Sequence, residues 1–198
     1  MSGDNETMRF TRRFCFGAIV LAAAVGTVAA QEKGKAMPKP GFTLTTSSFQ
    51  DGGEIPPKYT QSSPHPISPA LAWSHVPANT AAFVLIMHDP EAVDHKMTED
   101  HLHWMLLNIP ATVHELPEGV PATPTLADGT IQCKNVGGTV GYRGPGAGAQ
   151  GPYHHYTLEM FALDTKLDLG PDATRTEVLK AMEGHILGKS VVVGRFHR

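Results

Sequence analysis

The chain has 198 residues, of which 41% are hydrophobic and 18% are charged. This length suits one domain with its own core and excludes two well-filled domains, while the composition excludes general disorder. The formal net charge of −3 provides no basic field for a phosphate backbone, so we expect no nucleic-acid partner. Twenty glycines and sixteen prolines predict many turns, and therefore short strands rather than long helices.

Residues 1–30 have the layout of a secretory signal peptide. Arginines precede the apolar residues 15–25, and the small residues 28–30 suit the site that a signal peptidase cleaves. The alternative is a membrane anchor, which needs about twenty apolar residues, but a Gly-Thr pair ends this stretch early. We therefore expect cleavage before Gln31, a periplasmic or secreted protein, and no stable membrane insertion after cleavage. The sequence leaves open whether export uses the general or the twin-arginine route.

Cleavage would leave a single cysteine, Cys133, in the mature protein. An intramolecular disulfide is thereby excluded, even in an oxidising compartment. The thiol could act as a nucleophile, as a metal ligand or as buried filling, and burial is the commonest state of a free cysteine.

After a polar lead-in at residues 31–41, the chain is predicted to form one domain over residues 42–198. Turns rich in Gly, Pro and Asn divide this domain, and there is little helical periodicity between them. The pattern predicts a mainly β fold, an antiparallel β-sandwich rather than a parallel α/β sheet. Five segments have the alternation or the apolar, β-branched composition of strands: 42–46, 81–87, 102–109, 154–163 and 190–196.

One helix is well signalled, over residues 175–183, and we expect one or two short helices near the C-terminus. Thr174 and Glu177 have the spacing of a capping box, and Gly184 follows at the other end. A segment rich in glycine and proline, residues 141–152, precedes the fourth predicted strand. It is longer than a plain connection needs.

Asp89 stands at the end of a buried predicted strand, where we expect Pro90 to stop the strand. A carboxylate at that position can face a pocket. It can equally cap the following turn through an Asx-type hydrogen bond. The sequence leaves both roles open.

Histidines supply the other candidate groups. His101 and His103 fall on one face of a predicted strand, because side chains alternate with a period of two. Two such residues can bind one metal ion, or one can be packed while the other lies at a solvated strand end. In the fourth predicted strand His154 is in register with Tyr156 and points inward, whereas His155 points outward. His154 could donate to an anion beside the Gly-rich loop or be a satisfied core histidine.

Seven short motifs in the chain resemble those of the phosphatidylethanolamine-binding protein (PEBP) family, in the bacterial branch often called Raf kinase inhibitor-like. The resemblance runs from about residue 41 to residue 196, and the shared order of the motifs argues against a chance match. The motifs are Ile55-Pro56-Pro57-Lys58-Tyr59-Thr60, Ser68-Pro69-Ala70-Leu71-Ala72-Trp73, Asp89-Pro90-Glu91-Ala92, His103-Trp104 with Asn108-Ile109-Pro110-Ala111, Gly141-Tyr142-Arg143-Gly144-Pro145, His154-His155-Tyr156 and Phe161-Ala162-Leu163-Asp164.

The resemblance implies an antiparallel β-sandwich with a small anion pocket, and the bacterial members imply a homodimer as one candidate assembly. Imidazoles and N–H groups of the loop would donate to phosphoryl oxygens. The carboxylate would orient one imidazole, because alone it would repel an anion. Matched motif by motif, the ligand-binding residues are Asp89, His103, Gly144, Pro145, His154 and Tyr156.

Two departures from the family pattern bear on this pocket. The family continues its loop as Gly-Pro-x-Pro-Pro, whereas Gly146-Ala147-Gly148 follows Pro145 here, which predicts a more mobile loop. The family's arginine in His-Arg-Tyr is replaced by His155. This removes a permanent charge from an outward-facing position, and we expect it to alter the rim more than the interior.

Three functions follow as hypotheses. The leading one is an exported, non-catalytic binding protein, without a cofactor, for a small anionic ligand such as phosphate or a phosphoryl or carboxylate head group. The second is a copper- or zinc-binding protein that uses His101 and His103 with His88 or His154. The third is a weak hydrolase with Asp89 and His103 as an acid/base pair. Common catalytic signatures are absent from the sequence and the motifs place no Ser or Cys as a nucleophile, which favours binding over catalysis.

Overall fold

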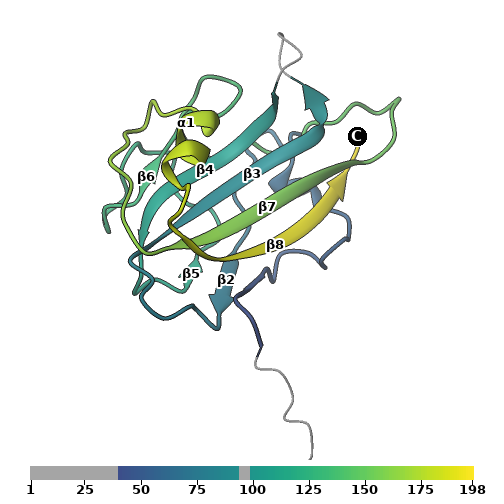
Figure 1. Cartoon of the computed structure of the whole chain (residues 1–198). Coiled ribbons are helices and arrows are strands. Elements are labelled where there is room, and N and C mark those ends of the chain that lie inside the picture. The colour runs from purple at the N-terminus through teal and green to yellow at the C-terminus, as the bar shows by residue number, and fades with distance from the viewer. Residues whose placement is uncertain (1–39, 94–98) are drawn as a thin grey trace, which may run out of the picture. The chain divides into compact units, whose positions relative to one another are not determined.

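The computed structural model describes residues 40–93 and 99–198. The predicted signal peptide and nearly all of the predicted lead-in lie outside the described residues. Within the described part of the chain, no helix combines the length and apolar character needed to cross a membrane. The elements, shown in Figure 1, are β1 (Thr43–Thr45), a 3-10 turn (Pro57–Tyr59), β2 (Leu71–Ser74), β3 (Ala82–Val93), β4 (Asp100–Pro110), β5 (Glu115–Leu116), β6 (Ile131–Gln132), β7 (His154–Leu163), α1 (Arg175–Ala181) and β8 (Ile186–Phe196).

The larger of two sheets has the strand order β6-β4-β3-β7-β8, and all its neighbouring strands are antiparallel. Its central strand, β3, begins with an unbroken apolar run, as a strand that is covered on both faces requires. The ladder between β3 and β7 starts at Ala82 and ends where His88 pairs with Thr157. Near this end the pairing of β3 with β4 also shifts register. The strands therefore lose regular pairing at one end of the sheet.

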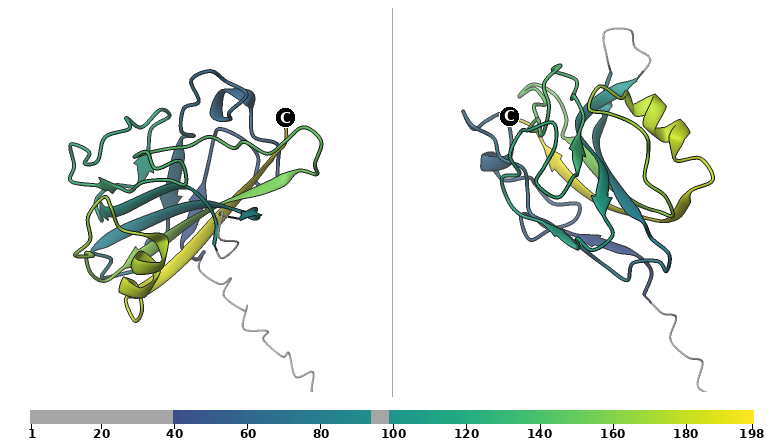
Figure 2. Two further views of the ribbon diagram at one scale, coloured as in Figure 1. Left: turned by 90° about the horizontal axis from the view of Figure 1, so that it is seen from above. Right: turned by 90° about the vertical axis from the view of Figure 1, so that its left-hand side faces the viewer.

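The smaller sheet, with the order β1-β2-β5, packs against one face of the larger sheet (Figure 2). Fully buried side chains from both sheets and their connections form the core between them, including Phe83, Leu85, Leu106 and Tyr156. Burying one large apolar side chain contributes about 1.5–3 kcal/mol, so this core is a main source of stability. The predicted antiparallel β-sandwich is confirmed.

A second core lies on the opposite face of the larger sheet, where α1 packs (Figure 1). Val178 and Met182 contact the sheet there, together with Ile86 and the fully buried Cys133. Burial raises the pKa of the Cys133 thiol to about 12, which keeps it protonated at neutral pH. Of the three roles open to this cysteine, buried filling fits the structure.

The predicted capping box begins α1. The Thr174 side chain accepts from the backbone N–H of Glu177, and the Glu177 carboxylate accepts from the backbone N–H of Thr174. The helix ends at Ala181, two residues earlier than predicted, and Gly184 follows with a φ of +80°. That backbone conformation favours glycine, which accounts for its place after the helix.

All five predicted strands are present, but the expected end of β3 was wrong. Pro90 does not stop the strand, which continues to Val93. A proline lacks the N–H that a central strand must donate, but at Pro90 the ladder with β7 has already ended, so no bond of that ladder is lost. The short strands β2, β5 and β6 were not predicted, because two to four residues carry too little periodicity.

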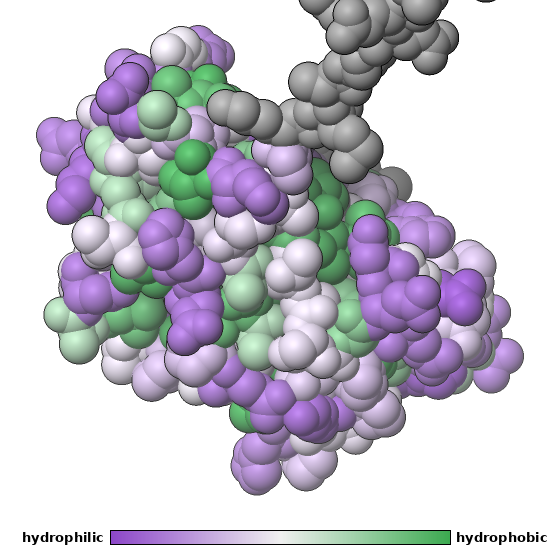
Figure 3. Space-filling view, turned by 90° about the horizontal axis from the view of Figure 1, so that it is seen from below, coloured by the Kyte–Doolittle hydropathy of each residue, from purple (hydrophilic) through white to green (hydrophobic). Residues whose placement is uncertain are grey.

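On the face shown in Figure 3, hydrophilic residues surround smaller apolar areas. Singly exposed apolar side chains are normal on a protein surface and need no partner. The large apolar residues that are exposed in the described part of the chain are Val93, Val136, Leu179, Ile186, Leu187 and Val191.

Candidate functional site

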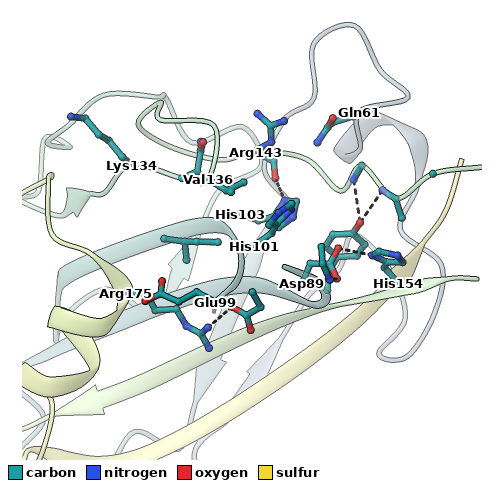
Figure 4. Close-up of a pocket in the computed structure, with 18 of the residues that line it drawn as sticks. Gln61, Asp89, Glu99, His101, His103, Lys134, Val136, Arg143, His154 and Arg175 are labelled. Carbon is teal, nitrogen blue, oxygen red and sulfur yellow. Dashed lines mark hydrogen bonds and ion pairs between the residues drawn. The ribbon is translucent and has the colours of Figure 1, made fainter. Parts of the chain in front are cut away.

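A cavity of about 740 Å³ lies beside the end of the β3–β7 ladder. Its walls come from segments that are far apart in the sequence: the ends of β3, β4 and β7, the loop before β7, and the start of α1. Asp89 and His154 lie toward one end of the cavity and Lys134 and Arg175 toward the other (Figure 4). The fold therefore brings three of the predicted sites, on three different strands, to one hollow.

Asp89 is 2% exposed and uses both of its carboxylate oxygens. Oδ1 accepts the backbone N–H groups of Glu91 at 3.0 Å and Ala92 at 3.2 Å, which is the Asx-type cap of the turn. Oδ2 lies 2.8 Å from Nδ1 of His154. The two roles that the sequence left open are thus filled together, and Asp89 orients an imidazole, as the family resemblance implied.

The first residues of β7 alternate as predicted. His154 and the fully buried Tyr156 face inward, whereas His155 faces outward and its Nδ1 lies 2.7 Å from the Glu91 carboxylate. Hydrogen bonding with His155 lowers the pKa of Glu91, against the opposing effect of partial burial. Where the family has a permanent charge, this chain therefore has a titratable ion pair at the rim.

His103 lies deeper than His101, and both line the cavity (Figure 4). Nδ1 of His103 donates to the backbone carbonyl of Arg143 at 2.9 Å, and its ring meets the Tyr156 ring edge-on at 5.1 Å between centroids. Burial lowers the pKa of His103, although the Arg143 carbonyl and Asp89 act in the opposite direction. The deeper imidazole is therefore mostly neutral at pH 7.

The predicted pair His101 and His103 is on one wall, as the strand period required. Within residues 40–93 and 99–198, no group of three or more His, Cys, Asp or Glu side chains is arranged to hold a metal ion. The carboxylate of Asp89 lies against Nδ1 of His154, whereas Nδ1 of His103 donates to the Arg143 carbonyl.

Gly144 and Pro145 are buried behind the cavity wall rather than in it, and the next residues, Gly146 and Ala147, line the cavity instead. A side chain at position 144 would place its Cβ 2.8 Å from the backbone oxygen of Tyr59, so only glycine fits there. Gly144 and Pro145 thus set the path of the loop by close packing.

Gln61 holds this loop in place, although it was not predicted. Its side-chain Nε2 donates to the carbonyl of Gly144 at 2.8 Å, and its backbone N–H donates to the carbonyl of Pro145 at 2.8 Å. The side-chain amide also lies directly against Gly146, where an added Cβ would be 2.4 Å from Nε2. These contacts give the loop a brace where the family pattern has additional prolines. Gln61 lies in a polar stretch that carries no recognisable motif.

The hydroxyl of Tyr156 fixes the other side of the loop. It accepts the backbone N–H groups of Gly146 and Ala147, both at 3.1 Å. Burial, and then the negative charge of Asp89, raises the pKa of this phenol to about 12, so it stays neutral. The N–H groups that were expected to donate to an anion therefore donate to Tyr156.

The other end of the cavity contains paired charges. Arg175 forms an ion pair with Asp100 at the start of β4, and Lys134 lies 2.6 Å from the exposed carboxylate of Asp172. Arg143 is exposed at the rim, and its guanidinium lies against Gly137. The paired cations add little unbalanced positive charge at this end.

Comparisons with known proteins agree with this fold. A model of the family described as phosphatidylethanolamine-binding protein matches residues 45–197. The chain is 42% identical over 157 residues to a UPF0098 protein of Methanothermobacter thermautotrophicus, covering 79% of this chain and 99% of that protein. It is 40% identical over 152 residues to a UPF0098 protein of Aquifex aeolicus, covering 76% and 85%.

Two solved structures resemble the chain over nearly their whole length. A PEBP homologue from Chlamydia trachomatis has a TM-score of 0.68 at 31% identity, covering 80% of this chain and 98% of that one. YbcL of E. coli, described as a new member of the mammalian PEBP family, has a TM-score of 0.69 at 25% identity, covering 80% and 99%.

Proposed function

The chain belongs to the phosphatidylethanolamine-binding protein family, and from this membership and the cavity geometry we propose that it is a non-catalytic binding protein for a small anion. The ligand is a phosphoryl or carboxylate head group. One observation carries the proposal: two imidazoles of one cavity, His103 and His154, are each held through Nδ1 by a fixed acceptor. Each ring therefore keeps Nε2 for a ligand, and its orientation is set before the ligand arrives.

Other features of the cavity support binding rather than turnover. Within the described part of the chain, no Ser or Cys lines the cavity, so an oriented imidazole has no such side chain to activate. The volume of about 740 Å³ is within the range of small-molecule sites. It exceeds what a single phosphate needs, so the cavity has room for a group attached to the anion.

A calorimetric titration with inorganic phosphate, phosphoethanolamine and acetate tests this proposal. We expect saturable binding that falls about tenfold to hundredfold in His154→Ala, the loss of one charged hydrogen bond. His155→Ala is the matched control, because this neighbour points away from the cavity and should leave the affinity unchanged. Absence of binding by all three compounds would overturn the proposal. Stoichiometric zinc or copper binding instead would revive the metal hypothesis.

We also propose that the protein is exported, on the strength of the signal-peptide pattern in residues 1–30. The N-terminal sequence of the protein recovered from its producing cell tests this directly. A mature chain that begins at Gln31 is the expected result. A chain that retains residues 1–30 would contradict it.

A further inference from the structure

The polar atoms around His103 and His154 can be accounted for one by one. A hydroxyl oxygen has two lone pairs and one proton. Both lone pairs of the Tyr156 hydroxyl are taken by the N–H groups of Gly146 and Ala147. Those two backbone donors are therefore not available to a ligand, unlike the loop donors in many anion sites. The proton of this hydroxyl faces Asp89, so the groups left to hold an oxyanion at this end of the cavity are chiefly the two imidazoles.

Both imidazoles carry their proton on Nδ1, which faces the protein, and not on Nε2, which is left for an anion. The acceptor of His103 Nδ1 is a backbone carbonyl, and that of His154 Nδ1 is a carboxylate, so in both rings Nδ1 carries the hydrogen. In the neutral ring Nε2 is then a lone-pair acceptor. Among the described residues neither Nε2 has a hydrogen-bond partner, and neither is sealed in the interior as the Nε2 of His88 is. The two imidazoles thus offer acceptors to a ligand that consists of acceptors.

From this mismatch between acceptor groups we propose, on the basis of the proposed function, that the pocket selects oxyanions that carry an exchangeable proton. A hydrogen phosphate (H2PO4⁻ or HPO4²⁻) or a monoprotonated phosphomonoester donates its own hydrogen to Nε2 of His103 or His154. An oxyanion without a proton, such as sulfate or a phosphomonoester dianion, binds only together with a proton taken up by one of these rings, which turns Nε2 into a donor. In both cases one N–H···O or O–H···N bond forms for each proton bound, and no covalent bond changes.

The surrounding charges favour this proton-linked state. The fixed negative charge of Asp89, 2.8 Å from the His154 ring, opposes an oxyanion that brings no proton. Burial lowers the pKa of His103, so that ring does not bring a proton at pH 7 by itself. The remaining titratable or charged groups that line the cavity are His101 and Glu99, Asp100 and Arg175, and Lys134 and Arg143.

Isothermal calorimetry with inorganic phosphate and with sulfate tests the proposal. Titrations at about pH 8 and about pH 5.5 bracket the ordinary pKa of histidine, and buffers of different ionisation enthalpy reveal proton uptake. Sulfate carries no proton at either pH, whereas phosphate at the higher one is mainly HPO4²⁻, which keeps one. At about pH 8 we expect phosphate to bind with its own proton, and sulfate to bind at least about tenfold more weakly and with uptake of about one proton. At about pH 5.5 protonated imidazoles should reduce the difference in affinity between phosphate and sulfate.

Two variants make the test independent of folding. His154→Gln replaces a partly exposed imidazole by an amide, which can donate a hydrogen bond without taking a proton from solution. Proton uptake on sulfate binding should therefore fall, and the preference for phosphate over sulfate should decrease. His185→Gln is the matched control, because His185 forms the same kind of pair with Asp164 at an exposed position and should change neither. Thermal unfolding checks that both variants are folded.

The possible results separate the two proposals. Sulfate binding as tightly as phosphate at about pH 8, and without proton uptake, would overturn the selection for a proton-bearing oxyanion and leave the binding function standing. Absence of phosphate and sulfate binding at both pH values would overturn both. Binding of sulfate in preference to phosphate would also contradict the inference.

Discussion

Two histidine–aspartate pairs lie on opposite faces of the larger sheet, at adjacent positions of β3. On the face that holds Tyr156, His154 Nδ1 is 2.8 Å from Asp89 Oδ2, and on the face that carries α1, His88 Nδ1 is 2.6 Å from Asp100 Oδ2. His88 and Asp89 are consecutive in the strand, so the alternation of side chains sends one pair to each face.

The pairs differ in what surrounds the second ring nitrogen. Nε2 of His88 is buried without a hydrogen bond, 3.7 Å from the Glu159 carboxylate, and Asp100 also pairs with Arg175 of α1. The ring of His154 instead lines an open cavity. The same kind of pair thus fastens a helix to the sheet on one face and, in the proposed function, prepares a ligand-binding group on the other. Access to Nε2, rather than the pair itself, separates a structural histidine from a binding one.

Removing each ring in turn tests whether the two pairs have different roles. His88→Ala should lower the free energy of unfolding by about 1–3 kcal/mol, because the partly buried carboxylates of Asp100 and Glu159 lose a partner. It should leave phosphate affinity within about twofold, since His88 does not line the cavity and its partner Asp100, which does, keeps its ion pair with Arg175. Urea denaturation and calorimetry measure the two quantities. His154→Ala should instead lower the phosphate affinity and leave the free energy of unfolding nearly unchanged. A loss of phosphate binding in His88→Ala with an unchanged free energy of unfolding would contradict the division of roles.

A smaller effect is expected at the loop that closes the cavity face. Gln61→Met keeps the length of the side chain but removes its hydrogen bond to Gly144, a loss of about 0.5–1.5 kcal/mol. Phosphate affinity should fall roughly twofold to tenfold through a looser loop, while proton uptake on binding stays unchanged. Gln61→Glu accepts but cannot donate at this position and should behave like the methionine variant. An unchanged affinity in both would show that the brace is dispensable.

The smallest effect concerns pH and stability in the absence of ligand. Burial places the pKa of His103 in the folded state below its value in the unfolded chain, about 6.5. Below that pH the unfolded chain binds a proton that the folded chain does not, so the free energy of unfolding decreases as pH falls through this window and is regained above it. His103→Gln should weaken this dependence, measured by urea denaturation at several pH values. An identical dependence in variant and parent would show that His103 titrates normally.

The fold could be predicted from the sequence wherever periodicity was strong. β7 begins and ends where its alternation indicated, and the capping box placed the start of α1. The extension of β3 through Pro90 could not be predicted, because it depends on where a partner strand distant in sequence stops pairing. Short strands were missed for the same reason, since their partners rather than their own residues define them.

The candidate site could be predicted as a set of residues but not as a hydrogen-bond network. Asp89, His103, His154 and Tyr156 meet in the structure, as the motifs implied. The motifs could not show that the loop N–H groups are taken by Tyr156, because that requires the loop's path in space. Nor could they show Gln61, whose role depends on packing against a glycine distant in sequence.

The central claim is that two imidazoles bind the anion through Nε2 while a third, chemically similar one does not. Nitrogen-15 NMR of the imidazole rings during a phosphate titration at about pH 7.5 tests it, because the ring shifts report which nitrogen carries a proton. Phosphate should move the Nε2 signals of His103 and His154 toward the hydrogen-bonded position and leave His88 unchanged. Equal shifts of all three rings, or a response at His88 alone, would contradict the account.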